Sequence, residues 1–279
     1  MPNCLRVRFY EFILNMICRV PDSWSRSFLA AGLMGQLIFG IAAGSAAQSR
    51  PPAVNSSEIS AKADAARDAN RLEEAIPLYK QALALRPDWA EGWWSLGTIS
   101  YDQNSYSGAA LAFHKVVALV PNNGTAYVML GLSEFELGRD DLALSHIKKG
   151  MSLGLNTSPE LRHVALYHES VLWQRQGKFQ AAQETLQQLC LQGVQSDEVT
   201  SILGMTLLRQ RSRSVPRNSP DVEIVSRIGN AECLAGQKKF EEGRSDLSAL
   251  VAQHPIFPEI HYAFGLFLMD ANDVPAAVA

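Results

Sequence analysis

The chain has 279 residues, of which 47% are hydrophobic and 19% are charged, and its formal net charge is −3. This composition is typical of a globular protein and excludes a disordered or collagen-like chain. Because Lys and Arg do not outnumber Asp and Glu, the composition also argues against a nucleic-acid partner.

Residues 1–47 are predicted to form a signal peptide. Arg19 and Arg26 precede an apolar run over residues 28–43, and the segment ends in small residues at Ala47. A positive start, an apolar middle and a small-residue exit are typical of a secretory signal, so we expect export to the periplasm or the cell exterior. The alternative is a membrane anchor at residues 28–43, although this run is shorter than the roughly 20 residues of a membrane span. The protein would contact a membrane only if this segment stays uncleaved.

A polar linker with a Pro-Pro pair is predicted over residues 48–56, and helical patterns follow from residue 57. The first two helices are expected at residues 58–70 and 72–85. The first of them is polar and rich in alanine, which is typical of a helix that caps the end of a repeat array.

The stretch from Asp88 to Pro121 carries two helical patterns joined by a turn at Asn104-Ser105. Small residues at Gly97 and Ala109 allow the two helix axes to approach closely. The large side chains of Trp93, Leu96 and Phe113 fill the space between the helices. Pro121 ends the second helix, because proline cannot donate the next helical hydrogen bond.

The same residue types recur at a spacing of 34 residues. Ala75, Ala109 and Ala143 step by 34, and so do Tyr79, Phe113 and Ile147. A fixed period of this length is the signature of a stacked repeat array. The pattern resembles the tetratricopeptide repeat family, whose unit is a 34-residue pair of antiparallel helices. The positions that carry the resemblance best are Trp93, Leu96, Gly97, Ala109, Phe113, Pro121, Gly131 and Ala143.

This resemblance implies an all-α, right-handed superhelical solenoid of about five to six units. Repeats one to four are assigned to residues 57–192, with a helix stop at Gly154 and a capped start at Thr157-Ser158-Pro159-Glu160. Residues 193–220 are irregular. They hold a helix at 197–211 whose partner helix is missing, followed by a basic, proline-containing loop.

Further repeats are expected over residues 221–279, with helices at 222–235 and 240–253. The last repeat is incomplete, which would leave an apolar face uncovered where a stable array ends in a polar cap. We therefore expect either that something covers this end or that the chain is a fragment.

Two cysteines, Cys190 and Cys233, remain after the predicted signal peptide. Free Cys is among the most buried residue types, so a pair of buried free thiols is the first interpretation. A disulfide between them is the alternative in an oxidising compartment.

No catalytic or metal-binding motif stands out. The sequence has no phosphate-binding loop, no nucleophile elbow and no zinc-type Cys/His spacing. His163 and His168 are five residues apart, which does not place them on one helical face, and both are interpreted as helix-surface residues. We expect no cofactor, no metal and no catalysis.

The resemblance also implies a concave groove lined by the first helix of each pair. The adjacent Trp93 and Trp94 cannot both point into one helix–helix seam, so Trp93 is assigned to the core and Trp94 to the groove. The groove residues implied in this way are Trp94, Thr98, Tyr101, Val128, Leu132, Phe135, Tyr167 and Val171. An aromatic and aliphatic groove favours a protein or peptide partner. The alternative is that these side chains pack against neighbouring helices.

The sequence therefore favours an exported repeat scaffold that binds a protein or peptide and catalyses nothing itself. Two alternatives stay open. The chain is the repeat region of a larger enzyme, such as a transferase, or it is a membrane-tethered assembly factor.

Overall fold

The computed structural model describes residues 55–155, 159–210 and 220–278. The predicted signal peptide, almost all of the linker, the Thr157-Ser158 cap and most of the basic loop lie outside these residues. Across the described part, no helix combines the length and the apolar character needed to cross a membrane.

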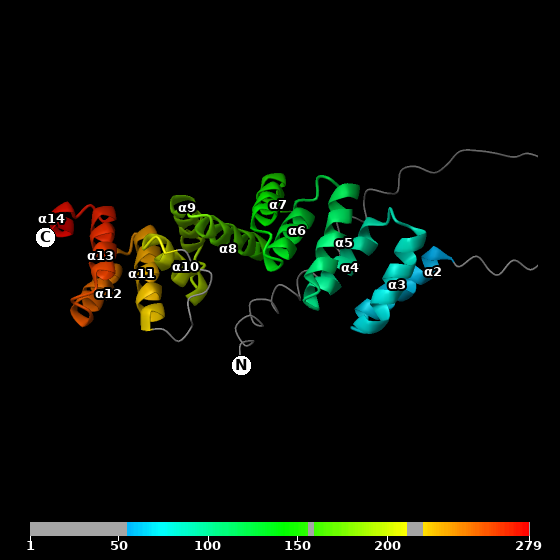
Figure 1. Cartoon of the computed structure of the whole chain (residues 1–279), viewed down its shortest axis with the longest axis horizontal. Helices are drawn as coiled ribbons and strands as arrows, with labels where there is room; N and C mark the ends of the chain where they lie inside the picture. The colour runs from blue at the N-terminus through cyan, green and yellow to red at the C-terminus, as the bar shows by residue number, and fades with distance from the viewer. Residues whose placement is uncertain (1–54, 156–158, 211–219, 279) are drawn as a thin grey trace, which may run out of the picture. The chain divides into compact units, whose positions relative to one another are not determined.

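All regular structure in the described residues is helical, which confirms the all-α class with repeated helix pairs (Figure 1). The helices are α2 (Ser56–Asp68), α3 (Leu72–Leu85), α4 (Ala90–Asp102), α5 (Tyr106–Leu119), α6 (Gly124–Glu136), α7 (Asp140–Leu153), α8 (Pro159–Arg175), α9 (Phe179–Leu191), α10 (Asp197–Leu207), α11 (Pro220–Gly236), α12 (Phe240–Gln253), α13 (Pro258–Asp270) and α14 (Val274–Val278).

The turns inside the helix pairs repeat the 34-residue phase in the backbone. Asn70, Asn104 and Gly138 each adopt a positive φ, of 55°, 57° and 70°, and they lie 34 residues apart. Lys238 and Asn272 do the same near the C-terminal end, with φ of 62° and 61°. Gly and Asn tolerate this left-handed conformation well, which explains why they dominate these positions.

The chain divides into two compact units, one up to Ser133 and one from Glu134 onward, with the division inside α6. In the first unit, α2 packs on α3, α3 on α4, and α4 on α5. The seam of α2, α3 and α4 is apolar around Tyr79, whose side chain is fully buried. The hydroxyl of Tyr79 donates to Asp64 Oδ1 over 2.6 Å and accepts a hydrogen bond from Arg67 Nη1 over 3.0 Å. Arg67 also donates to Ser95 Oγ, and so links α2 to α4.

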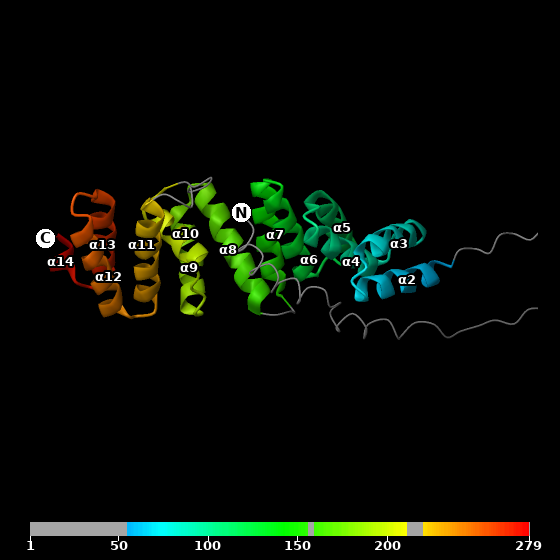
Figure 2. The same ribbon diagram turned by 90° about the horizontal axis from the view of Figure 1, so that it is seen from below.

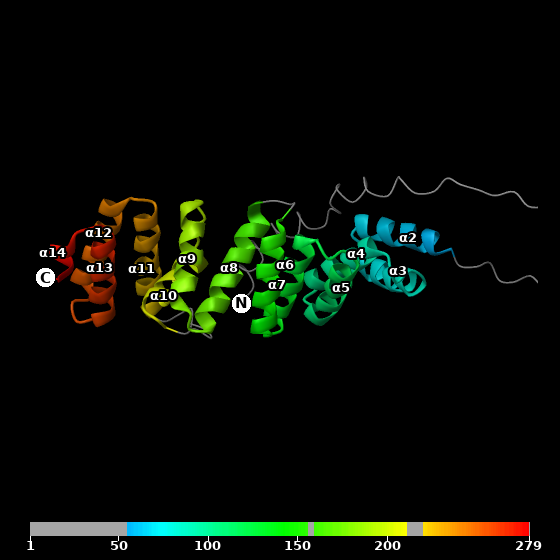
Figure 3. The same ribbon diagram turned by 90° about the horizontal axis from the view of Figure 1, so that it is seen from above.

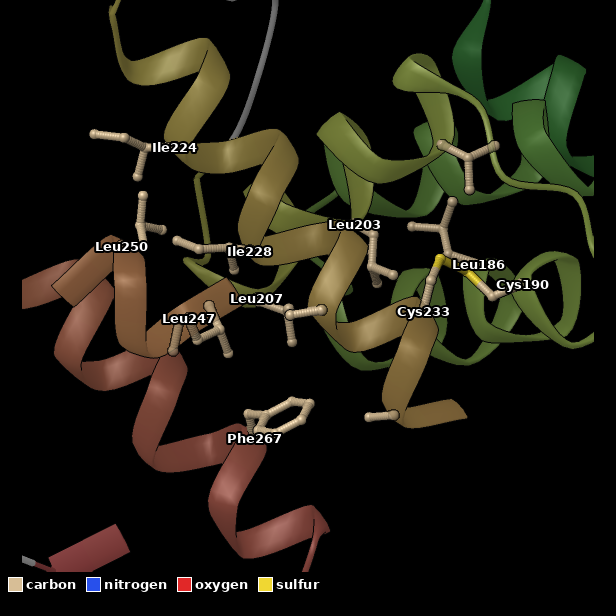
Figure 4. Close-up of a cluster of buried hydrophobic side chains, with 14 of the residues drawn as sticks. Leu186, Cys190, Leu203, Leu207, Ile224, Ile228, Cys233, Leu247, Leu250 and Phe267 are labelled. Carbon is tan, nitrogen blue, oxygen red and sulfur yellow. A yellow bond between two sulfur atoms is a disulfide. The ribbon is translucent and has the colours of Figure 1, made fainter. Parts of the chain in front are cut away.

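In the second unit, one apolar core is shared by α8 to α13, and Figure 4 shows part of it. Two further views show α11 with α9 and α10 on one side and α12 and α13 on the other (Figures 2 and 3). Leu203 of α10 and Ile228 of α11 point into this core, as does Phe267 of α13.

A disulfide joins α9 to α11 through Cys190 and Cys233, and both residues are fully buried. The free-thiol interpretation was therefore wrong. The two cysteines lie on neighbouring helices whose Cα atoms at these positions are 5.2 Å apart, a spacing within the range that a disulfide spans. Gln237 Nε2 adds a hydrogen bond to the carbonyl oxygen of Cys190.

The helix at 197–211 was expected to lack a partner, and this expectation was also wrong. α10 packs closely against α11. A Cβ atom at Gly204 would lie 1.9 Å from the backbone oxygen of Val225, and one at Gly229 would lie 1.8 Å from that of Thr200. The two backbones therefore meet directly. The sequence hid this pairing because about a dozen residues between Leu207 and Pro220 interrupt the repeat spacing.

Candidate functional site

The two adjacent tryptophans of α4 lie in different surroundings. The Trp94 ring is 4% exposed and meets Phe113 of α5 edge-on, with 5.4 Å between ring centroids. The half-buried Trp93 packs against the apolar seam of α2, α3 and α4, and its Nε1 donates to the Pro87 carbonyl oxygen. Phe113 thus takes Trp94 as its aromatic partner, where the sequence analysis had assigned it Trp93. Phe113 also fills the space next to Gly97, because a Cβ atom added at Gly97 would lie 2.9 Å from the Phe113 ring.

Most of the predicted groove residues are buried in the isolated chain, as the alternative interpretation expects. Tyr101 packs edge-on against Tyr106, with ring centroids 5.3 Å apart. Phe135 and Tyr167 are half-buried and keep part of their surface accessible. The buried ones are Trp94, Thr98, Tyr101, Val128, Leu132 and Val171. The binding role of all eight residues stays a prediction.

An aromatic cluster in the second unit brings two of the predicted residues together. Phe135, at the end of α6, and Tyr167 of α8 both meet the His168 ring edge-on, at centroid distances of 4.7 and 5.3 Å. Arg175 lies over the ring of Phe135, with its guanidinium carbon 4.5 Å from the ring centroid. We call Phe135, Tyr167, His168 and Arg175 the α6–α8 cluster.

His168 was interpreted as a surface residue, but it is 5% exposed. Its Nδ1 lies 2.8 Å from the carbonyl oxygen of Val164, one helical turn earlier. The sequence signal that could have identified it is its position directly after Tyr167 on a helix whose two sides are both apolar. His163, by contrast, is half-buried, with its Nε2 2.9 Å from Gln192 Oε1.

Polar contacts hold Arg175 in place beside the aromatic rings. Its Nη1 donates to Asp140 Oδ1 over 3.0 Å, and the neighbouring Gln176 donates to Asp141. The two acids start α7, so these bonds tie the end of α8 to the start of α7. A guanidinium that is both ion-paired and stacked loses little side-chain entropy when a partner binds against it.

A second aromatic–cation arrangement surrounds Trp173 on α8. The ammonium nitrogens of Lys148 and Lys178 lie 4.9 and 4.5 Å from the indole centroid. The Trp173 N–H donates to Glu169 Oε1 over 3.3 Å. Burial raises the pKa of the Glu169 carboxyl, while this hydrogen bond and Lys148 act in the opposite direction. The indole already interacts with two lysines of this chain, so we interpret the arrangement as structural.

A polar pocket of about 320 Å³ lies between the start of α10 and the middle of α11. Its walls are bonded to each other, because Thr200 Oγ1 pairs with Ser226 Oγ and Gln195 pairs with Asn230. Arg227 is engaged by Asp246 and Gln253. In the described residues, no three His, Cys, Asp or Glu side chains are grouped so that they could hold a metal ion.

Comparison with known proteins places the similarity in the repeats. The family model described as tetratricopeptide repeat matches residues 60–123 and 101–149. Human "Protein O-mannosyl-transferase TMTC3" is 30% identical over 120 residues, which is 43% of this chain and 13% of that protein. "Protein FlbA" of Caulobacter vibrioides is 32% identical over 87 residues, which is 31% of this chain and 15% of that protein. The chain thus spans a small part of each of these relatives.

A solved structure, "Crystal structure of MamA protein", superposes with a TM-score of 0.52 at 16% identity and covers 67% of this chain and 94% of that one. At this identity the likeness shows the fold alone. Because the named relatives differ in kind and each matches less than half of this chain, the comparisons support tetratricopeptide-type repeats here and leave the partner unidentified.

Proposed function

We propose that this chain is an exported tetratricopeptide-type scaffold that binds a protein or peptide segment on the first helices of its pairs and performs no catalysis itself. The observation that carries the proposal is the α6–α8 cluster. It combines half-exposed aromatic surface with an Arg held in place, and aromatic residues and Arg are enriched among residues that dominate binding energy.

The disulfide supports export. A buried bond between Cys190 and Cys233 forms and persists in an oxidising compartment and is rare in the cytosol. This agrees with the signal peptide predicted over residues 1–47. Sequencing the N-terminus of the protein recovered from the exported fraction tests it, with Gln48 as the expected first residue. Recovery of residues 28–43 in a membrane fraction would instead favour the anchored alternative.

Affinity purification from the exported fraction tests the binding role. We expect the wild type to retain a partner. The amount of partner recovered should fall about tenfold or more with Phe135→Ala or Tyr167→Ala, because removal of a binding hot spot costs about 2 kcal/mol of binding free energy. Leu142→Ala is the matched control, since Leu142 is 50% exposed on the neighbouring α7. Trp94→Ala is less informative, because loss of a buried ring would also lower stability. Equal recovery with all variants would remove the α6–α8 cluster from the proposal.

The second candidate is that these repeats belong to a larger transferase. The specific observation in its favour is the 120-residue similarity to the O-mannosyl-transferase TMTC3. Reading the gene beyond residue 279 separates the two functions. A downstream catalytic domain would favour the enzyme, and a stop codon after a completed helix would favour the scaffold.

A further inference from the structure

The second helices of the N-terminal unit expose apolar side chains on the side that faces away from their core. On α5, Phe113 and Val116 are fully buried, whereas Leu111 is 60% and Leu119 is 39% exposed. Leu85 of α3, which lies 34 residues before Leu119, is 51% exposed. We give the name outer face to the exposed residues Lys80, Leu85, Leu111, Lys115, Ala118 and Leu119.

The outer face lies inside the row of described helices. Leu111, Lys115 and Leu119 are spaced by four residues, which places them along one side of α5. α4 packs against both α3 and α5, and all three belong to the unit that extends to Ser133. α2 precedes these helices and α6 follows them in the chain (Figure 1). The exposure of the outer face therefore belongs to a part of the array that has helices before and after it.

Charge along the outer face is positive on α5. From Gln103 to Ser133 the sequence contains the basic residues His114 and Lys115 and no Asp or Glu. On α3, Lys80 stands 34 residues before His114. Within the part of the chain that the structure describes, neither Lys80 nor Lys115 forms a salt bridge. Both ammonium groups can therefore pair with a carboxylate from outside.

The acidic side chains nearest to this face stand at the two ends of α3. Glu73 is exposed in the first turn, and Asp88 is exposed just beyond the last turn. The neighbouring Glu74 is paired with Arg71 over 2.6 Å. Arg86 adds a positive charge at the same end as Asp88. The unpaired positive charge is thus concentrated in the middle of α3 and along α5.

We propose that the outer face binds an acidic amphipathic helix of another protein, whose apolar stripe packs on its leucines and whose carboxylates face Lys80 and Lys115. Exposed apolar surface next to charge marks interaction sites, and complementary charge selects the partner. A second copy of this chain fits poorly, because its outer face would bring lysine against lysine. A flat anionic bilayer also fits poorly, because it would approach Glu73 and Asp88 together with the lysines. This site is separate from the α6–α8 cluster and does not depend on the proposed function.

The test uses the full-length protein and two synthetic peptides of about 18 residues, long enough to form a helix on binding. Both peptides carry leucines at helical spacing, and one has glutamates and the other lysines at the remaining positions. We expect anisotropy titration to show binding of the glutamate peptide only. The affinity should fall as salt is added, because the paired charges lie at the surface.

Two variants of α5 and their matched controls on α7 locate the site. Lys115→Glu should weaken binding of the glutamate peptide about tenfold, because it replaces an attraction with a repulsion, while Lys149→Glu at an exposed lysine should not. Leu111→Gln should weaken binding on the order of tenfold through the loss of apolar contact, while Leu142→Gln at a 50% exposed leucine should not. Circular dichroism of each variant establishes that the helices are intact.

Equal binding of the two peptides would overturn the proposal, and so would the same affinity in Lys115→Glu and Lys149→Glu. A third contrary outcome is the absence of peptide binding together with binding to phosphatidylglycerol vesicles that Lys115→Glu abolishes, which would assign the outer face to a membrane. A fourth is a concentration-dependent dimer in sedimentation that Leu111→Gln dissociates, which would assign it to a second copy.

Discussion

Single polar residues fix the seams between helices in this molecule. Tyr79 shows how, because its ring is fully buried while its hydroxyl bonds Asp64 and Arg67. Burial is the main cause of the raised pKa of this hydroxyl, and the hydrogen bond to Asp64 adds to it. The 34-residue alignment predicts an aromatic or aliphatic residue at this position, which Phe113 and Ile147 satisfy further along. It does not predict the polar network.

Tyr79→Phe removes the hydroxyl and keeps the ring. We expect the free energy of unfolding to fall by about 1 kcal/mol, because Asp64 and Arg67 each lose a hydrogen bond in a partly buried site. Urea denaturation measures the change, with Tyr262→Phe as a control at a 50% exposed ring. An equal effect in both variants would show that the hydrogen bonds of the Tyr79 hydroxyl contribute no more to stability than an exposed hydroxyl does.

Glu232 is a buried carboxyl, 4% exposed, that accepts hydrogen bonds from Gln183 and Gln187 of α9. Burial raises its pKa, the two glutamines lower it, and Asp270 raises it further. The folded state therefore holds this proton more tightly than the unfolded state, so stability falls as pH rises from the ordinary value of 4.5 through the raised one.

Glu232→Gln keeps an acceptor oxygen and removes the charge. We expect this variant to be more stable than the wild type at pH 7.5 and to lose that advantage at pH 4, where Glu232 is protonated in both states. Thermal unfolding of both proteins across this range checks the sign. A wild type that becomes relatively more stable with rising pH would contradict the assignment.

At the scale of elements, the α10–α11 crossing depends on two glycines. The nearest neighbours of an added Cβ are backbone oxygens, at 1.9 Å for Gly204 and 1.8 Å for Gly229, so neither can be relieved by a side-chain rotation. We expect Gly204→Ala to destabilise the protein by about 3 kcal/mol or more, because overpacking here must separate two backbones. Gly236→Ala, with nothing within 4 Å, should be neutral or slightly stabilising. Chemical denaturation of both variants makes the comparison.

The elements themselves were largely predictable from the sequence. α3 and α12 have the predicted bounds, and Gly154 ends α7 with a φ of 84°. These predictions succeed because periodic apolar residues and helix stops act locally. The pairing of α10 with α11 was not predictable in the same way, since it depends on the contacts of Gly204 with Val225 and of Gly229 with Thr200, which follow no repeat period.

The candidate site was harder to predict than the fold. The family spacing identified Phe135 and Tyr167 as candidates. It did not identify His168, the buried residue whose ring both of them contact in the structure. The spacing also could not decide which of Trp93 and Trp94 meets Phe113, because either ring satisfies it; in the structure Trp94 meets Phe113 and Trp93 packs against the seam of α2, α3 and α4.

At the scale of the whole molecule, the disulfide compensates for the break in the repeat between α9 and α11. It joins residues 43 positions apart, on either side of α10 and the basic loop. Closing a loop of this length in the unfolded chain stabilises the folded state by about 4 kcal/mol in the chain-entropy treatment. The stability of the second unit is therefore expected to depend on the redox state of its surroundings.

The double variant Cys190→Ala/Cys233→Ala tests this dependence. We expect it to unfold at a lower denaturant concentration than the oxidised wild type, with a free energy of unfolding that is lower by several kcal/mol. Dithiothreitol should not change the stability of the variant. The wild type in dithiothreitol should approach the variant once thiol labelling shows both cysteines to be free. If the reduced wild type keeps its full stability, the Gln237 bond to Cys190 and the α10–α11 crossing already hold these helices together without the disulfide.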